Sequence, residues 1–343
     1  MLAAVLRAPN DLRLEQVPDP APGHGEVVVA VKACGICQTD YLAITGGRMN
    51  WEPGSITGHE FAGVIANVGD GVEGWAEGDD VVVMPIGTCG RCKHCQAGKQ
   101  HYCVDGYVIG GDGQPRFYHG AFAEYCKVPA SSLFAKPATL SMEAAALTEP
   151  LAGSYKGMIA YTQMTVAEDV VIIGGGSMGL LLTQVASAAG AGTLIVVDLV
   201  DFRLDMAKRC GATHTINGAS EDVKARVAEI LPDGPDVVFE AAGALQAASL
   251  AFDLCRRGTR MNMFGVIVPG TIPVSPGHIH FTEIRMDASF SVTPTVMRKS
   301  LDLQRKGLVD AGKIITHRVP LADMYEALDI MKQPDRVKVM VLP

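Results

Sequence analysis

The chain has 343 residues, of which 48% are hydrophobic and 19% are charged, and its formal net charge at pH 7 is -8. This length suits two domains of roughly 150 residues each, and the hydrophobic content excludes an intrinsically disordered chain. The acidic balance argues against nucleic acid as a partner, because phosphate backbones select basic surfaces. We therefore expect two hydrophobic cores with a cleft between them.

The N-terminal segment, MLAAVLRAPNDLRLEQV, predicts a first strand, and it lacks the basic start and apolar run of an export signal. The longest apolar stretches are interrupted by glycine and polar residues, which a membrane helix of about 20 apolar residues rarely carries. Nine cysteines, an odd number, fit a reducing compartment better than a disulfide framework. The sequence therefore predicts a soluble, cytoplasmic protein that does not enter a membrane.

Strand and helix signals divide the chain into two regions with different secondary-structure patterns. Up to about residue 150, short β-type runs such as EVVVAVKAC and DDVVVMPIG are separated by glycine and proline, which predicts a mostly β domain. From about residue 151, the strand-like runs VVIIGG, LIVVD and DVVFEAAG alternate with helical segments, a pattern typical of a parallel doubly wound sheet. After about residue 289 come two amphipathic helices and a last strand, VKVMVL. The predicted fold class is therefore α/β.

A first candidate metal site lies in the β-rich half. Cys37 is followed by Thr39 and Asp40, and His59 and Glu60 stand side by side about twenty residues later. Cysteine, imidazole and carboxylate all bind zinc, and three protein ligands with one open position define a catalytic site. Asp40 is placed to hold the second ring nitrogen of a ligating His59. Taken alone, His59 is better explained as a buried histidine, but the whole set predicts a catalytic zinc.

A second candidate metal site is formed by four cysteines in GTCGRCKHCQAGKQHYC, with two gaps of two residues and then a gap of seven. Closely spaced thiolates bind zinc tetrahedrally, and a complete set of four sulfurs predicts a closed, structural site. The alternative is a group of reduced loop cysteines, which would be exposed and easily oxidised. The four residues are Cys89, Cys92, Cys95 and Cys103.

Glu149 lies in AALTEPLAG, where the chain leaves the β-rich half, and hence near the expected cleft. Its carboxylate could be a fourth ligand of the catalytic zinc or a partner of a water molecule. The alternative is a helix-start carboxylate before Pro150. The sequence leaves both possibilities open.

A dinucleotide-binding motif, GGGSMG, follows the strand VVII and opens a helix of small residues. Its first glycine allows a tight turn, its second lets the backbone approach the pyrophosphate, and its third permits close packing of helix on strand. About twenty residues later, Asp198 ends LIVVD, where a carboxylate can bind the adenosine ribose and repel a 2′-phosphate. This favours NAD, although Asp198 could also be an exposed turn residue and the nearby Arg203 keeps NADP open. The residues of the motif are Gly174, Gly176, Ser177, Met178 and Gly179.

Together these motifs resemble the zinc-dependent medium-chain dehydrogenase/reductase superfamily, and the resemblance runs along the whole chain. The matching segments are GHE, CGIC, the four-cysteine segment, TEPLAG and GGGSMG. Within the superfamily, Glu60 and Glu149 look like the polyol branch, which includes sorbitol and threonine dehydrogenases. The resemblance implies a GroES-like catalytic domain of residues 1–150 and 289–343, wrapped around a Rossmann domain of residues 151–288.

The resemblance also implies an activity, the reversible NAD-linked oxidation of a secondary alcohol in a polyol, sugar or cyclitol to a ketone. Each chain would carry two zinc ions, one structural and one catalytic, the latter held by Cys37, His59 and Glu60, with Glu149 ligating directly or through water. Thr39 would relay the substrate proton. Family members are commonly homodimers or homotetramers, often paired at the sheet edge that corresponds to residues 286–292, which the resemblance implies for this chain. A dehydrogenase of amino alcohols, as in threonine dehydrogenase, and a non-catalytic NAD-binding zinc protein are the alternatives.

Three features depart from the family pattern. Ser291 follows Phe290 where sorbitol dehydrogenases tend to have an arginine, which puts sorbitol itself in doubt. Tyr41 and Leu42 stand where many alcohol dehydrogenases have a relay histidine. Three polar residues of SPGHIHFTEIRMD could face the substrate or could belong to a polar loop, and these are His278, His280 and Glu283.

Overall fold

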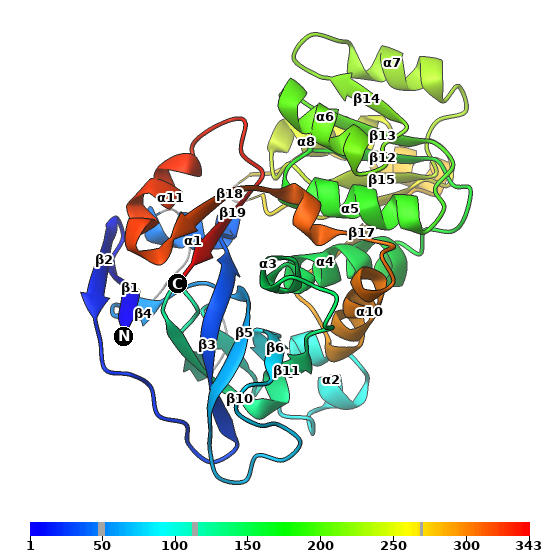
Figure 1. Cartoon of the computed structure of the whole chain (residues 1–343). Coiled ribbons are helices and arrows are strands. Elements are labelled where there is room, and N and C mark those ends of the chain that lie inside the picture. Colours follow the sequence, from blue (N-terminus) through cyan, green and yellow to red (C-terminus); the bar gives the residue numbers. More distant parts are fainter. Residues whose placement is uncertain (47–51, 112–115, 268–269) are drawn as a thin grey trace. The chain divides into compact units, whose positions relative to one another are not determined.

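The computed structural model describes residues 1–46, 52–111, 116–267 and 270–343, which form two compact units (Figure 1). The first unit comprises Met1–Ala152, Ser291–Gly307 and Ile315–Pro343, and the second comprises Gly153–Phe290 and Leu308–Ile314. The sequence interpretation placed residues 308–314 with the β-rich domain. They pack with the second unit because the Asp310 N–H donates to Gln184 Oε1 (2.9 Å) and Ile314 is buried.

The first unit is built mainly from antiparallel strands. The largest sheet has the order β11-β6-β5-β3-β19-β18, with β10 paired to β3, and two smaller sheets have the orders β2-β1-β4 and β7-β8-β9. The strands are β1 (Leu2–Ala8), β2 (Asp11–Gln16), β3 (Glu26–Gly35), β4 (Ser55–Ile56), β5 (Glu60–Val68), β6 (Asp80–Val83), β7 (Ile86–Gly87), β8 (Tyr107–Ile109), β9 (Arg116–Tyr118), β10 (Tyr125–Pro129), β11 (Leu133–Ala135), β18 (Ile315–Pro320) and β19 (Lys338–Leu342). The helices are α1 (Gln38–Ile44), α2 (Lys93–Gln96), α3 (Met142–Ala146), α10 (Pro294–Arg305) and α11 (Met324–Ile330), and in α4 (Thr148–Tyr155) the chain passes to the second unit.

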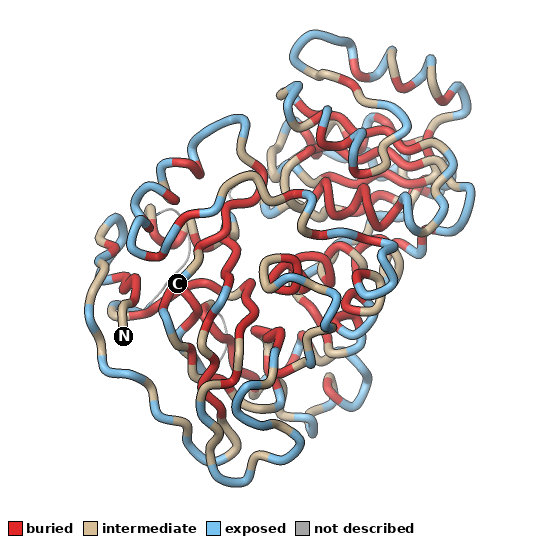
Figure 2. The backbone as a smooth tube through the Cα atoms, viewed as in Figure 1, coloured by how far each residue is buried: buried red, intermediate tan, exposed pale blue. Residues whose placement is uncertain are grey.

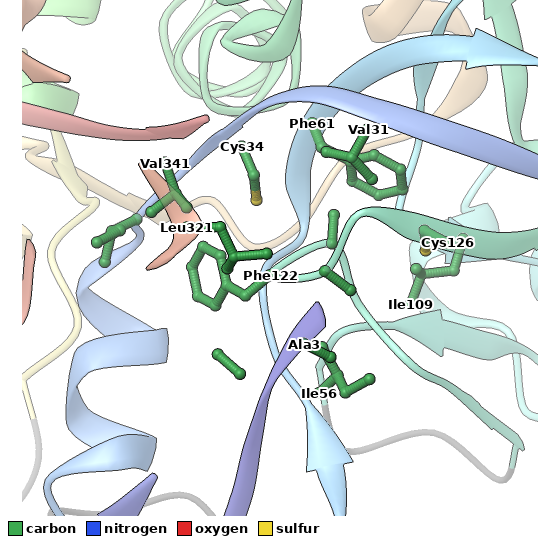
Figure 3. Packing of buried hydrophobic residues seen from close by; sticks show 14 of the residues in the cluster. Ala3, Val31, Cys34, Ile56, Phe61, Ile109, Phe122, Cys126, Leu321 and Val341 are labelled. Carbon is green, nitrogen blue, oxygen red and sulfur yellow. The ribbon is translucent and has the colours of Figure 1, made fainter. Parts of the chain in front are cut away.

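The core of the first unit lies between these sheets. Valine-rich strands such as β3 suit a pleated sheet that is buried on both faces, because β-branched side chains pack well there. Figure 3 shows side chains of β3, β5 and β19 gathered with Phe122 and Leu321 in one cluster. Phe61 and Phe122 have no exposed surface. This cluster forms a rigid base for the loops that leave the ends of β3 and β5.

The register of the large sheet brings distant residues together. Gly35, the last residue of β3, lies opposite Glu60, the first residue of β5, and also opposite Met340 of β19. The chain that follows β3 and the chain that precedes β5 therefore leave the sheet at the same end. As a result, Cys37 and His59 are neighbours although they are separated by more than twenty residues of sequence.

The second unit contains a parallel sheet with the strand order β14-β13-β12-β15-β16-β17. Strands β12, β13 and β15 are buried along their whole length (Figure 2), as expected for a sheet covered on both faces. The order reverses between β12 and β15, and in such sheets ligands bind at this switch point, outside the carboxyl ends of the strands. The strands are β12 (Val170–Ile173), β13 (Leu194–Asp198), β14 (His214–Asn217), β15 (Val237–Glu240), β16 (Arg260–Met263) and β17 (Arg285–Ala288), and the helices are α5 (Ser177–Ala188), α6 (Asp201–Arg209), α7 (Val223–Ile230), α8 (Leu245–Asp253) and α9 (Pro276–Thr282).

Both kinds of domain predicted from the sequence are present, a β-rich unit and a doubly wound unit. Shorter helical segments complete the fold, namely the π-helix η3 (Lys156–Tyr161) and the 3₁₀ turns η1 (Gln100–Tyr102), η2 (Ala130–Ser132), η4 (Ala311–Ile314) and η5 (Leu321–Asp323). In the part of the chain that the structure describes, every helix is too short or too polar to span a bilayer.

Candidate functional site

The four-cysteine segment folds into one compact cluster in the first unit. The sulfurs of Cys89, Cys92, Cys95 and Cys103 all lie within 4.8 Å of one another. The Cys92 and Cys95 sulfurs are 3.5 Å apart, and the Cys89 backbone N–H donates to the Cys103 sulfur over 3.2 Å. Four sulfurs converging on one point fit a tetrahedral zinc ion, whereas unrelated loop thiols would not converge.

Backbone groups around this cluster favour the thiolate that zinc requires. N–H groups of Cys95 and Val104 lower the pKa of Cys92 to about 6. Burial instead raises the pKa of Cys95 to about 12, because a thiolate there would be desolvated beside its neighbours. A bound divalent cation would offset that repulsion, so the donor set suits a closed structural metal site.

The second candidate metal site lies at the end of the large sheet in the same unit. One ligand atom from each of Cys37, His59 and Glu60 lies within 4.8 Å of the other two. Cys37 precedes α1, and His59 directly precedes β5, so the pairing of β3 with β5 creates this cluster. The three residues that the sequence predicts as ligands are therefore brought together.

Asp40 joins the two loops that carry these ligands. Its side chain is fully buried, Oδ2 accepts the Cys37 N–H (3.0 Å), and Oδ1 accepts the Gly58 N–H (3.1 Å). Oδ1 also lies 3.3 Å from His59 Nδ1. With Nδ1 facing Asp40, Nε2 is the ring nitrogen left for a metal.

The neighbouring groups determine the pKa of His59. Burial lowers the pKa of His59, but the Asp40 carboxylate and the Cys37 sulfur outweigh burial, so that pKa stands well above its usual value. The surrounding groups thus stabilise positive charge at this position. A metal cation would be favoured there for the same reason, because it faces the same negative groups.

Lys338, which sequence reasoning missed, forms a buried ion pair with Glu60. Its Nζ lies 2.7 and 3.0 Å from the two carboxylate oxygens of Glu60 and donates to the Ile36 carbonyl (3.1 Å). Burial lowers the pKa of Lys338, yet the charge of Glu60 holds it above its usual value. Both oxygens of Glu60 therefore already have a cationic partner, which a metal would have to share. The only sequence signal was a lysine inside the otherwise apolar strand VKVMVL.

Glu149, the other candidate carboxylate, lies in the first turn of α4 and is partly buried. It is not one of the described residues whose ligand atoms lie within 4.8 Å of one another. Burial raises its pKa to about 7, while the nearby charge of His59 lowers that pKa and Glu60 raises it. Glu149 is thus an electrostatic neighbour of the cluster, and a cation bound there would stabilise its ionised carboxylate.

Thr39 lies in the first turn of α1, between Cys37 and Asp40 in sequence, and is partly buried. Tyr41 follows on the same helix and packs against the core of the first unit. The three polar residues near α9 belong to the second unit and are exposed, and among them Glu283 ends α9 with a φ of 55°. The ring of His278 packs edge-on against Phe252 (5.6 Å between centroids).

The glycine-rich motif of the second unit connects β12 to α5. Gly174 has a φ of 108°, and a Cβ on it would lie 2.7 Å from the Ala242 nitrogen. A Cβ on Gly179 would collide with the carbonyl oxygen of Gly174, so only glycine permits this approach of helix and loop. Gly176 is the N-cap of α5 and offers no side chain, which suits an anion such as pyrophosphate at the helix N-terminus. Ser177 and Met178 form the first turn of α5.

Asp198 ends β13 beside this motif. Its Oδ2 accepts the Gly175 N–H (2.7 Å), and its Oδ1 accepts the N–H groups of Leu199 (2.8 Å) and Val200 (3.0 Å). Arg203 lies above the motif with a guanidinium nitrogen 3.9 Å from Oδ2. Asp198 is therefore buried and not the exposed turn residue of the alternative, and its carboxylate is fixed at the glycine-rich loop.

Comparison with known proteins finds relatives that match along the whole chain. Residues 23–138 match the alcohol dehydrogenase GroES-like domain, and residues 177–306 match the zinc-binding dehydrogenase domain. The chain is 35% identical to the sorbitol dehydrogenase of Bacillus subtilis (strain 168), covering 100% of this chain and 97% of that protein. It is 31% identical to the L-threonine 3-dehydrogenase of Bacillus velezensis, covering 96% and 95%. A solved structure described as a zinc-binding dehydrogenase of Sinorhizobium meliloti 1021, bound to NADP, superposes with a TM-score of 0.93 at 32% identity, covering 100% and 99%.

Proposed function

Because this chain belongs to the zinc-dependent medium-chain dehydrogenase/reductase superfamily and is an NAD(P)-linked oxidoreductase, we propose that it oxidises a secondary alcohol of a polyol, sugar or cyclitol reversibly to a ketone. The observation that carries this proposal is the cluster of Cys37, His59 and Glu60, which is separate from the four-cysteine site. A closed four-sulfur site does no chemistry, whereas three protein ligands leave a position for substrate.

We propose two zinc ions per chain, one in each cluster. Cys37, His59 and Glu60 bring a sulfur, an imidazole nitrogen and a carboxylate oxygen within 4.8 Å of one another, and all three are donors that bind zinc, so a divalent cation fits. Zinc held there would supply a Lewis acid that lowers the pKa of an alcohol oxygen. Cys37, His59 and Glu60 would hold this zinc, with Glu149 ligating directly or through water.

The chain's own residues then have separate roles. Asp40 fixes the tautomer and orientation of His59, because its carboxylate faces Nδ1. Lys338 holds the Glu60 carboxylate in place through their buried ion pair. Thr39 follows Cys37 in the first turn of α1, and its hydroxyl is proposed to take the proton from the substrate oxygen and pass it on toward solvent.

We propose NAD as the coenzyme, with the pyrophosphate at Gly174, Gly176, Ser177, Met178 and Gly179. The dinucleotide would supply the hydride acceptor. Asp198 supports NAD over NADP, because its carboxylate is held at the loop by Gly175 and would repel a 2′-phosphate. The S. meliloti relative was solved with NADP, and Arg203 lies beside Asp198, so NADP is the comparison to make.

The substrate class rests on similarity to sorbitol dehydrogenase, and similarity to L-threonine 3-dehydrogenase supports an amino alcohol as the second candidate. The partner is thus a small-molecule alcohol. We also propose a homodimer or homotetramer, because β17 is an edge strand with an exposed face and Phe290 beyond it is 68% exposed. All nine cysteines lie among the described residues and are free thiols, which supports a cytoplasmic location.

The test is NADH formation by the zinc-loaded protein across a panel of polyols, inositols, sugars and amino alcohols, with NADP in parallel. We expect turnover with hydroxylated substrates that lack an amine, and with NAD rather than NADP. Turnover confined to amino alcohols would favour the threonine dehydrogenase type. Stoichiometric zinc without reduced coenzyme from any alcohol would leave the non-catalytic alternative.

A further inference from the structure

Glu240, the last residue of β15, is a buried carboxylate with no role in the mechanism above. It has no exposed surface and lies in the middle of the parallel sheet, opposite Ile173 of β12 on one side and Met263 of β16 on the other. A carboxylate at such a position costs free energy unless its oxygens are well bonded. Contacts of the Glu240 side chain must therefore compensate this cost.

The side chain of Glu240 turns back onto the loop that follows its own strand. Oε1 accepts the N–H groups of Ala242 (2.9 Å) and Gly243 (2.7 Å). The backbone carbonyl of Glu240 accepts the N–H groups of Phe264 (3.0 Å) and Gly265 (2.8 Å), which belong to the loop after β16. One residue therefore fixes two neighbouring loops.

The second carboxylate oxygen points at the loop after β16. Oε2 is buried and finds no hydrogen-bond donor of good geometry among residues 1–46, 52–111, 116–267 and 270–343. A Cβ on Gly265 would collide with it, so the glycine at this position leaves the space that Oε2 occupies. Burial raises the pKa of Glu240, although the Gly243 and Ala242 N–H groups act against this.

The loop after β12 is part of the same assembly. The Ala241 N–H donates to the Ile173 carbonyl (2.8 Å), and the Gly174 backbone packs directly on Ala241 and Ala242. The loops after β12, β15 and β16 are thus locked together at the carboxyl edge of the sheet, around Glu240. Above this buried carboxylate, Ala242 is exposed and Val266 is 69% exposed, so the edge presents an open surface.

The order of the strands shows which part of a dinucleotide would meet this edge. The pyrophosphate site is at Gly174 after β12, and the ribose-binding candidate Asp198 ends β13, on one side of β12. The adenosine half therefore extends toward β13, and the other half must extend over β15 and β16. We propose that Glu240 is a positioning residue that holds the loops after β12, β15 and β16 in the shape that receives the nicotinamide half of the coenzyme. This inference rests on the proposed NAD-linked function.

The test uses the full-length, zinc-loaded protein and two probes, NADH and ADP-ribose, which lacks the nicotinamide. Dissociation constants are measured by fluorescence titration and by competition. For Glu240→Ala we expect NADH to bind about tenfold more weakly, while ADP-ribose binds within about twofold of wild type. Glu240→Gln keeps one oxygen for the Ala242 and Gly243 N–H groups, so it should recover NADH binding to within about threefold of wild type.

Two further variants control for the loss of a buried polar side chain and for a failure of Glu240→Ala to fold. Asn262→Ala removes an equally buried polar side chain from β16, where Asn262 Nδ2 donates to Thr162 Oγ1 (2.9 Å), and it should not discriminate between the two probes. If Glu240→Ala does not fold, Gly265→Ala disturbs the same contact from the other side and should weaken NADH selectively. Equal weakening of both probes, or unchanged NADH binding in the folded variants, would overturn the inference. A wild-type protein that binds neither NADH nor NADPH would instead overturn the proposed function.

Discussion

Replacing Asp40 with asparagine should weaken the catalytic zinc site selectively. Asp40 accepts N–H groups from both ligand loops, at Cys37 and at Gly58, and its charge faces His59. Asparagine has one acceptor oxygen and one NH₂ group, so in either orientation a donor faces a backbone N–H in a fully buried position. Such an unsatisfied pair costs about 1–3 kcal/mol. Loss of an outer-shell partner typically lowers metal affinity about 10- to 100-fold, which is roughly 1.4–2.7 kcal/mol and agrees with that cost.

The assay is zinc content per chain after dialysis against chelators of graded affinity. The four-cysteine site serves as an internal reference, because none of its ligands contacts Asp40. Asp169→Asn is the matched control, since Asp169 Oδ1 also accepts a backbone N–H, from Thr193 (2.8 Å), but lies in the second unit. We expect Asp40→Asn to lose one zinc at a chelator strength about 10- to 100-fold lower than wild type does. Equal retention in Asp40→Asn and wild type would refute the role of Asp40.

Three further predictions concern other parts of the chain. Cys103→Ser should release the structural zinc and lower the melting temperature while NADH affinity stays unchanged; retention of two zinc ions would contradict this. Gly179→Ala should lower the free energy of unfolding by about 1–3 kcal/mol or more and weaken NADH binding. Gly176→Ala should leave the melting temperature unchanged, because no atom lies within 4 Å of its added Cβ. Equal melting temperatures of the two variants would refute this packing argument. Burial lowers the pKa of Lys156 to about 8 from its usual 10.5. Between these pH values the unfolded chain binds more protons at Lys156 than the folded chain does, so the contribution of Lys156 to stability rises with pH. Lys156→Met should remove this rise in the melting temperature, and an unchanged pH profile would show that Lys156 titrates normally.

The sequence alone was sufficient where the determinants are local. The four-cysteine cluster and the glycine-rich motif each lie in one short segment, so their spacing predicts their geometry. Cys37 and His59 were also predictable, although what brings them together is the long-range pairing of β3 with β5. That prediction depended on family resemblance as much as on residue chemistry.

Other features could not be predicted because they depend on contacts across long stretches of sequence. Lys338 reaches Glu60 across 278 residues, through the pairing of β19 with β3, and the lysine inside the apolar strand VKVMVL does not by itself indicate its partner. In the sequence, Glu240 is an ordinary polar residue at the end of a predicted strand. Only the order of the strands in the folded sheet places it at the switch point. Residues 308–314 pack with the second unit through the hydrogen bond of Asp310 to Gln184 and through buried residues such as Val309 and Ile314, and the composition of the segment gives no signal of this.

We propose that Cys37 belongs to a catalytic zinc site distinct from the structural one. The most direct test measures zinc per chain and coenzyme reduction together in wild type and in Cys37→Ser. We predict two zinc ions in wild type and one in the variant, with turnover lower by at least about a hundredfold, because a Lewis acid contributes several kcal/mol to the reaction. A Cys37→Ser protein that has lost one zinc but retains full turnover, or that keeps both zinc ions, would contradict the account.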